Sequence, residues 1–232
     1  MGASLAHGRN LEVLHITAVP EQVHLADALD EDQHSEALSR RILAMAEAEN
    51  VKLKYDKAVS RDIVHTIHET AARLDCEWVV MEAASRRKLG VAFQNPLGWL
   101  QDHLSCNLAV FKDAGIRYIR KILVYTEPGP NDALVVTTAD HLAEIYGAEL
   151  TFVVFIPHEL PNILEQSRID YVDQLRQLCS SATSVHVAHS EANVDAMTQI
   201  TTDYDLLVMG ATPSQSLMGL LRGTRKDRLT EH

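Results

Sequence analysis

The stretch VMGATPSQSLMGLLRGT (208–224) completes an apolar, strand-like run and continues into glycines and small polar residues. Such a sequence is typical of a loop whose backbone N–H groups hold a phosphate at the start of a helix. An earlier stretch, VMEAASRRKLGVAFQNP (80–96), has the same frame 128 residues upstream but lacks glycine at the matching positions. The repeated frame predicts two copies of one structural unit.

The residues before each copy support this prediction, because the same five elements recur in the same order. Each half has an apolar strand, an amphipathic helix, a second strand, a second helix and the strand that precedes the loop. Strands alternating with helices of this length indicate crossover connections and a parallel sheet. The nearly continuous apolar runs WVVM and LLVM predict strands buried on both faces. The paired ranges are 10–17 and 149–156, 35–49 and 162–180, 51–59 and 184–189, 61–74 and 192–202, and 76–81 and 204–209.

The remaining segments assign the chain to two units, 1–115 and 116–232. In the first unit a helix over about 96–104 leads to a last strand, CNLAVFK (106–112). The second unit opens with the strand KILVYT (121–126) and a helix over 132–148, for which Gly147 is the expected stop. The fold class that follows is α/β.

The two units lack different elements of the repeated pattern. The first lacks an opening strand and helix, and MGASLAHG (1–8) looks like the tail of a helix matching LAEIYGA (142–148); the second lacks a final strand. An open parallel sheet without an interior strand leaves a row of unpaired backbone groups beside its core. We therefore expect the chain to be a piece of a longer protein, truncated at both ends, or another segment to fill these places.

Composition limits the function classes. The net charge of −11 argues against binding to a nucleic-acid backbone, which needs clustered Lys and Arg. No apolar run approaches the ~18 residues of a membrane span, and the start does not read as a secretory signal. A cytoplasmic protein without direct membrane insertion is expected. The three cysteines contain no CxxC pair, which fits buried thiols in a reducing compartment: Cys76, Cys106 and Cys179.

The loop resembles the nucleotide loop of the universal stress protein family. That family carries Gly, two residues, Gly, nine residues, Gly, then Ser or Thr, directly after its fourth strand. Gly210, Pro213 and Gly223-Thr224 reproduce the spacing, with proline at the second glycine. KILVYTEPG (121–129) is similar to the family's first strand, and Glu127 stands where an aspartate normally contacts adenosine. The resemblance implies two tandem flavodoxin-like units with parallel, doubly wound sheets, paired about a pseudo-twofold axis.

The resemblance further implies one adenine-nucleotide site, for ATP or AMP, in the second unit. Pro213 has no N–H and cannot adopt positive φ, so this site is half intact. In the first unit Glu82 puts a negative charge where an anion would sit, and Asn95-Pro96 reads as an ordinary helix start. We expect the first site to be structural only. The residues predicted to contact the nucleotide are Val124, Glu127, Gly210, Gly223 and Thr224.

Within this family, degenerate nucleotide loops are common in the cytosolic tails of transporters. The stretches VMEAASRR and ILVYTEPGP resemble that group, specifically amino-acid permease-like and cation–proton antiporter-like proteins. The leading hypothesis is a non-enzymatic regulatory or sensing module of a transporter. Two alternatives stay open: a free-standing tandem stress protein that binds or slowly hydrolyses ATP, and a structural dimerisation domain without ligand. A homodimer, or a pseudo-dimer of the two units, and an attached transmembrane domain are the expected partners.

Metal binding and nucleophilic catalysis find little support in the sequence. His65 and His68 lie three apart on one predicted helix, but the pattern places no third ligand. His186 and His189 fall in a strand region, where a spacing of three points to opposite faces. No GxSxG motif is present. We predict neither a metal nor a catalytic residue.

Overall fold

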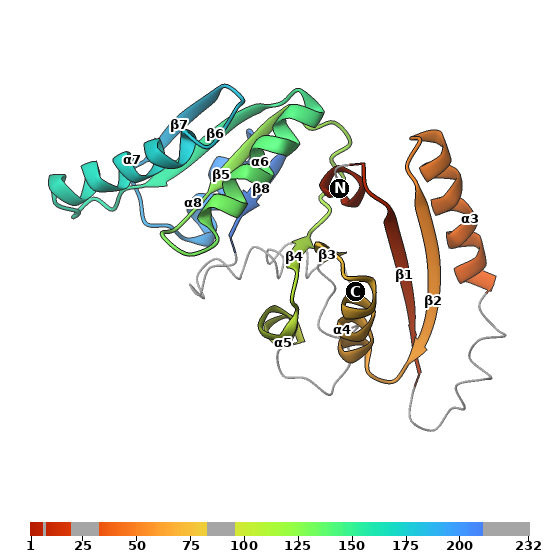
Figure 1. Cartoon of the computed structure of the whole chain (residues 1–232). Helices are drawn as coiled ribbons and strands as arrows, with labels where there is room; N and C mark the ends of the chain where they lie inside the picture. Colours follow the sequence, from red (N-terminus) through yellow and green to blue (C-terminus); the bar gives the residue numbers. More distant parts are fainter. Residues whose placement is uncertain (7, 20–32, 83–95, 211–232) are drawn as a thin grey trace, which may run out of the picture. The chain divides into compact units, whose positions relative to one another are not determined.

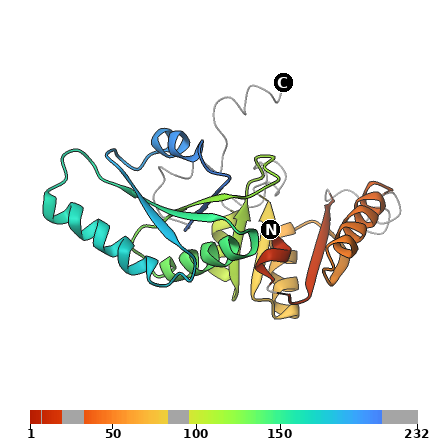
Figure 2. The same cartoon turned by 90° about the horizontal axis from the view of Figure 1, so that it is seen from above.

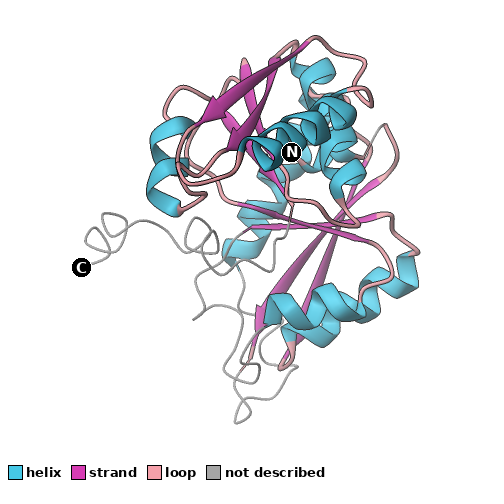
Figure 3. Cartoon of the chain, turned by 90° about the vertical axis from the view of Figure 1, so that its left-hand side faces the viewer, coloured by secondary structure: helices cyan, strands magenta, loops and turns pink. Residues whose placement is uncertain are grey.

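The computed structural model describes residues 1–6, 8–19, 33–82 and 96–210 of the chain. The chain divides into two compact units, Met1–Lys112 and Asp113–His232, which are described separately (Figure 1). Helices alternate with parallel strands in both units, as Figure 3 shows by colour. The α/β fold class predicted from the sequence is therefore confirmed.

Unit 2 contains one four-stranded parallel sheet with the order β7-β6-β5-β8. From β5 the chain continues to β6 and β7 on one side of that strand. It then returns to form β8 on the other side of β5. Its ladders pair Val124 with Phe152 of β6 and with Val208 of β8. The elements in chain order are β5 (Lys121–Tyr125), α6 (Asp132–Tyr146), β6 (Glu149–Phe155), α7 (Asn162–Arg176), β7 (Thr183–Ala188), α8 (Val194–Thr201) and β8 (Leu206–Met209).

Helices cover both faces of this sheet, as the doubly wound arrangement requires. Figure 2 shows α8 on one side of the strands and α6 and α7 on the other. On the α8 side, Met197 packs in one buried cluster with Leu123, Tyr125, Val153 and Phe155. Alternation along a strand sends residues such as Val124 and Phe152, both at most 1 % exposed, to the opposite face. The central strands are thus apolar on both faces.

Helix caps and side-chain hydrogen bonds fix the ends of several elements in unit 2. Gly147 has φ 62° and caps α6, as the sequence predicted. Asn193 begins α8 by accepting a hydrogen bond from the Ala196 N–H. The Asp205 carboxylate, just before β8, accepts hydrogen bonds from the N–H groups of Arg120 and Lys121 at 2.8 and 3.0 Å. This carboxylate fixes where β5 starts relative to β8.

Unit 1 follows the same order of elements, but its described strands form two separate ladders. Among its described residues β1 pairs only with β2 and β3 only with β4, each in a parallel two-stranded ladder. Figure 1 shows the two pairs. The elements are α1 (Gly2–Leu5), β1 (Leu11–Ala18), α3 (Gln33–Ala48), β2 (Leu53–Ser60), α4 (Ile63–Leu74), β3 (Trp78–Glu82), α5 (Pro96–His103) and β4 (Asn107–Phe111).

The strands of unit 1 are less buried than β5 and β6, the two central strands of unit 2. No residue of β1, β3 or β4 is buried, whereas Ile122–Tyr125 of β5 are at most 5 % exposed. The prediction that WVVM and LLVM are buried on both faces is wrong, because β3 and β8 are half-buried throughout apart from the exposed Glu82. Both strands lack a second hydrogen-bonded neighbour among the described residues. A continuous apolar run does not distinguish such an edge position from a central one.

Candidate functional site

The candidate site lies at the carboxyl ends of β5 and β8. Ligands of open parallel sheets bind where consecutive connections leave a strand toward opposite sides. In unit 2 that point lies between β5 and β8, because the chain moves from β5 to β6 and β7 and returns to β8 on the other side. Tyr125 pairs with Met209 in the parallel ladder. The next residues, Thr126 and Gly210, therefore leave the sheet at the same edge.

Hydrogen bonds fix the loop that follows β5. The Tyr125 hydroxyl donates to Glu127 Oε1 at 2.7 Å, and the Gly129 N–H donates to Asp132 Oδ2 at 2.7 Å. The Tyr171 hydroxyl of α7 also donates to Asp132 Oδ2. Asp132 is the first residue of α6, where a carboxylate is favoured by the helix dipole. The loop is thus anchored at both ends and tied to α7.

The hydrogen bond between Tyr125 and Glu127 is coupled to the ionisation of the Tyr125 phenol. Burial raises the pKa of the Tyr125 phenol well above its usual range, and the hydrogen bond to Glu127 raises it further. The phenol therefore stays protonated and acts as a donor at neutral pH. One oxygen of Glu127 is engaged in this way, and Glu127 is only half-buried, so its carboxylate can accept a further hydrogen bond from a ligand hydroxyl or amine.

Two further features of this edge concern the residues that follow β5 and β8. A Cβ added to Gly210 would lie 3.4 Å from Val135 Cγ2 of α6, so a large side chain at residue 210 would press on that helix. The Thr126 hydroxyl oxygen is buried and has no hydrogen-bond partner in the described structure. A buried hydroxyl without a partner is costly and favours a ligand or water that satisfies it.

The structure brings three of the five predicted site residues to this edge. Gly210 directly follows β8 and Glu127 is the second residue after β5, and the ends of these two strands are paired. Val124 lies one residue before Tyr125 in β5 and is fully buried, so its side chain belongs to the core of the unit. Gly223 and Thr224, with Pro213, lie outside the described residues. The sequence analysis missed Thr126, Asp132 and Tyr171. For Asp132 one local signal was available, because an acidic residue begins the predicted helix after Gly129-Pro130.

The loop of unit 1 is described only at its two ends. Glu82 is the exposed last residue of β3, and α5 begins at Pro96. Asn95 lies outside the described residues. The expectation that this copy is a plain helix start remains a prediction.

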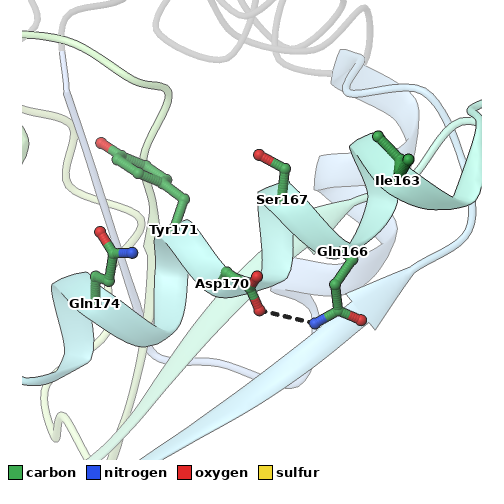
Figure 4. A pocket seen from close by; sticks show the side chains of 6 residues that line it. All are labelled: Ile163, Gln166, Ser167, Asp170, Tyr171 and Gln174. Carbon is green, nitrogen blue, oxygen red and sulfur yellow. Dashed lines mark hydrogen bonds between the residues drawn. The ribbon is translucent and has the colours of Figure 1, made fainter.

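Side chains of α7 alone line a surface depression of about 440 Å³ (Figure 4). Gln166 Nε2 donates a hydrogen bond to Asp170 Oδ1 at 2.7 Å across it. A depression formed on a single helix is open to solvent, so it lacks the enclosure of a ligand pocket. The lining residues are Ile163, Gln166, Ser167, Asp170, Tyr171 and Gln174.

Two of the histidines and two of the cysteines illustrate local contacts of these side chains. His65 Nε2 lies 3.1 Å from Glu69 Oε1, and the His103 ring stacks on Trp99 with 4.1 Å between centroids. In the described ranges no group of three His, Cys, Asp or Glu side chains is placed to hold a metal ion. Cys76 and Cys106, distant in sequence, have their sulfurs 3.6 Å apart, and burial raises the pKa of the Cys106 thiol to about 11.

In the described part of the chain no helix is long and apolar enough to span a bilayer.

Solved structures resemble this chain over most of its length. A universal stress protein from Archaeoglobus fulgidus superposes with a TM-score of 0.62 at 15% identity, covering 96% of this chain and 83% of that one. The chain has the fold of the universal stress proteins. A putative universal stress protein from Pseudomonas aeruginosa gives 0.58 at 19% identity, with 93% and 86% covered. A functionally unknown protein from the same species gives 0.58 at 18% identity, with 94% and 88% covered.

At these identities the likeness concerns the fold and not the ligand. Neither a protein-family model nor a curated protein sequence matches the chain. The resemblance seen in the sequence therefore stands on two supports: the spacing of the loop after β8 and the arrangement of strands and helices shared with universal stress proteins.

Proposed function

We propose that this chain is a non-enzymatic regulatory module of the universal stress protein type, with one adenine-nucleotide site in unit 2. In the proposal the module is the cytosolic regulatory part of a membrane transporter. Nucleotide binding favours one packing arrangement of the module, and that arrangement is read by the attached or associated transporter domain.

The observation that carries the proposal is the convergence of Glu127 and Gly210 at the switch between β5 and β8. The two residues belong to separate segments and follow strands that pair through Tyr125 and Met209. A small residue after β8 lets a ligand approach the backbone, and a carboxylate after β5 supplies an acceptor for ribose hydroxyls. The buried hydroxyl of Thr126, unpartnered among the described residues, is a second polar group at the same place.

The test is calorimetric titration of the chain with ATP, ADP and AMP, each with and without magnesium. Binding of at least one nucleotide without turnover is the expected result, and measurable hydrolysis would instead favour the alternative of a slow ATPase. No heat at millimolar nucleotide would overturn the sensing function and leave a structural dimerisation domain.

A pair of matched variants locates the site. Gly210→Leu should weaken nucleotide binding about tenfold or more, because its side chain fills the space beside Val135 at the loop start. Glu82→Leu, at the equivalent position 128 residues earlier, should leave binding unchanged. If Glu82→Leu weakened binding instead, the site would belong to unit 1. Circular dichroism of both variants excludes a simple loss of fold.

One residue from each copy of the repeated loop, Gly223 and Asn95, gives a further check. Replacing Gly223 by Leu should abolish binding, while changing Asn95 should have no effect.

The proposed link to a transporter has a separate test. In the genome, the sequence upstream of this chain and in the same reading frame should encode apolar spans of roughly twenty residues.

A further inference from the structure

We propose that Cys76 and Cys106 of unit 1 are a redox modification site, at which a peroxide oxidises the two thiols to a reversible disulfide. Both cysteines are free thiols, and their sulfurs lie 3.6 Å apart although the residues are 30 positions apart in the sequence. Both are only partly buried, so a small oxidant can reach them. The site belongs to unit 1, whereas the proposed nucleotide site belongs to unit 2.

The end of α4 fixes the backbone of Cys76. Asp75 adopts φ 49° after the last helical residue, and the Cys76 N–H donates back to the Ala71 carbonyl oxygen at 3.4 Å. A hydrogen bond over this span, with a left-handed residue before it, is typical of a Schellman helix end. Cys76 is therefore held in an ordered turn between α4 and β3.

The ladder of β3 with β4 brings Cys106 to the same place. Cys106 directly precedes β4, and the N–H of Asn107 donates to the Glu77 carbonyl oxygen at 3.0 Å. The spacing of neighbouring strands, about 4.8 Å, falls inside the Cα–Cα range of about 4.4–6.8 Å that disulfides bridge. The S–S bond length is about 2.05 Å, so the two sulfurs need to approach by about 1.5 Å.

The oxidation takes place in two steps. In the first, the Cys76 thiolate attacks one oxygen of the peroxide: an S–O bond forms, the O–O bond breaks, and the hydroxide that leaves takes up the proton released by the thiol. In the second, the Cys106 sulfur attacks the Cys76 sulfenic acid: the S–S bond forms, the S–O bond breaks, and the departing hydroxide takes the Cys106 proton. Two thiols lose two electrons, and one hydrogen peroxide is reduced to two waters.

The surroundings of Cys106 assign it to the second step. Burial raises the pKa of the Cys106 thiol to about 11, and the hydrogen bond with Cys76 contributes to the rise, so this thiol is protonated at neutral pH. Because the thiolate is the nucleophile toward peroxide, the first attack falls to Cys76. Cys106 needs no large thiolate population, since its sulfur already lies beside the sulfenic acid and the second step is intramolecular.

The disulfide would close a loop that contains β3, the first copy of the repeated loop, and α5. Among the described residues β3 and β4 pair only with each other. A cross-link restricts the unfolded chain, and the stabilisation grows with the number of residues that it encloses. Oxidation should therefore stabilise this half-buried part of unit 1, which makes the stability of the unit depend on the oxidant.

The experiment treats the fully reduced chain with hydrogen peroxide and follows its thiols and its stability. Titration of the denatured protein should fall from three thiols to one per chain, and non-reducing peptide mapping should recover Cys76 linked to Cys106. Trp78 and Trp99 both lie inside the closed loop, so the urea midpoint of their fluorescence should rise by about 1 M. Dithiothreitol should restore both starting values.

Serine variants assign the roles of the individual cysteines. Cys76→Ser and Cys106→Ser should each abolish the rise in urea midpoint, while the matched control Cys179→Ser should keep it. Dimedone, which labels sulfenic acids, should label Cys76 in the Cys106→Ser chain about tenfold more than Cys106 in the Cys76→Ser chain. Circular dichroism of the reduced variants checks their fold, and the measurements on the wild-type chain do not depend on them.

Several results would overturn the proposal. These are retention of all three thiols after peroxide treatment, and a disulfide that involves Cys179 or joins two chains. A bond between Cys76 and Cys106 that leaves the urea midpoint unchanged would contradict the stabilising effect. Stronger dimedone labelling of Cys106 than of Cys76 would overturn the assigned order of attack. None of these measurements involves a nucleotide, so their failure would leave the proposed function standing.

Discussion

The two units share an order of strands and helices, but β6 buries five of its seven residues and its counterpart β1 buries none. The difference does not come from composition, because β1 is as rich in branched apolar residues as β6. It comes from neighbours: β6 lies between β5 and β7, whereas among described residues β1 pairs with β2 alone. Burial in a parallel sheet depends on the strands alongside as much as on the strand itself.

The order of unfolding tests this comparison most strongly. Both tryptophans, Trp78 and Trp99, lie in unit 1, so their fluorescence reports on that unit, while circular dichroism reports on both. Unit 1 should unfold first in urea, with a midpoint about 2 M below that of unit 2. A single coincident transition by both probes would show that the units unfold as one body and that the difference in burial has no energetic consequence.

Alanine substitutions at two valines compare the strands directly. Val153→Ala in β6 removes buried atoms and should cost about 2 kcal/mol of unfolding free energy. Val13→Ala in β1 should cost less than about 1 kcal/mol, because Val13 is half-buried already. Urea titration of both variants gives the two values. Equal costs would contradict the comparison.

A buried carboxylate makes the stability of unit 2 depend on acid. Burial by itself raises the pKa of Asp140, but hydrogen bonds from Ser180 and Ser181 outweigh it and hold the pKa below its ordinary value. The stabilisation is therefore complete above the ordinary value of 3.8 and is lost as the pH falls through the lowered value. Asp140→Asn should cost about 1–2 kcal/mol at pH 7, because an amide accepts fewer of these hydrogen bonds.

The matching measurement follows urea midpoints of wild type and Asp140→Asn from pH 7 to pH 2. The two curves should converge as the pH falls from 3.8 through the lowered pKa of Asp140. A difference that persists unchanged in acid would mean that the asparagine disturbs packing and that the charge is not responsible.

The smallest expected effect compares two equivalent carboxylates. Asp205→Ala leaves the N–H groups of Arg120 and Lys121 without their acceptor and should destabilise unit 2 by about 1 kcal/mol. Glu77→Ala breaks a surface ion pair and should change unit 1 by less than about 0.5 kcal/mol. Thermal unfolding followed by tryptophan fluorescence and circular dichroism separates the two, and a larger loss for Glu77→Ala would invert the expected order.

The elements of this fold could be predicted closely from the sequence. The helix expected over 61–74 is observed as Ile63–Leu74, and the stop at Gly147 is where the chain adopts positive φ. Periodicity and helix-stop residues are local signals, so they can be seen in a single sequence. The half-burial of β3 could not be predicted, because apolar runs do not reveal whether a neighbouring strand is present.

The candidate site was predictable only where topology dictates it. Glu127 and Gly210 come together because parallel strands end at a common edge, which the strand order already implies. The pairing of Tyr171 with Asp132 depends on where α7 packs, and the closeness of the Cys76 and Cys106 sulfurs depends on the register of β3 and β4. Neither relation leaves a pattern in the sequence.

The unpaired edges of β1 and β3 among the described residues also bear on how the purified chain behaves at high concentration. Open strand edges are templates for edge-to-edge aggregation. The net charge of −11 opposes this through repulsion between molecules, and added salt screens that repulsion. We therefore expect the chain to remain dispersed at low ionic strength and to precipitate as salt is raised.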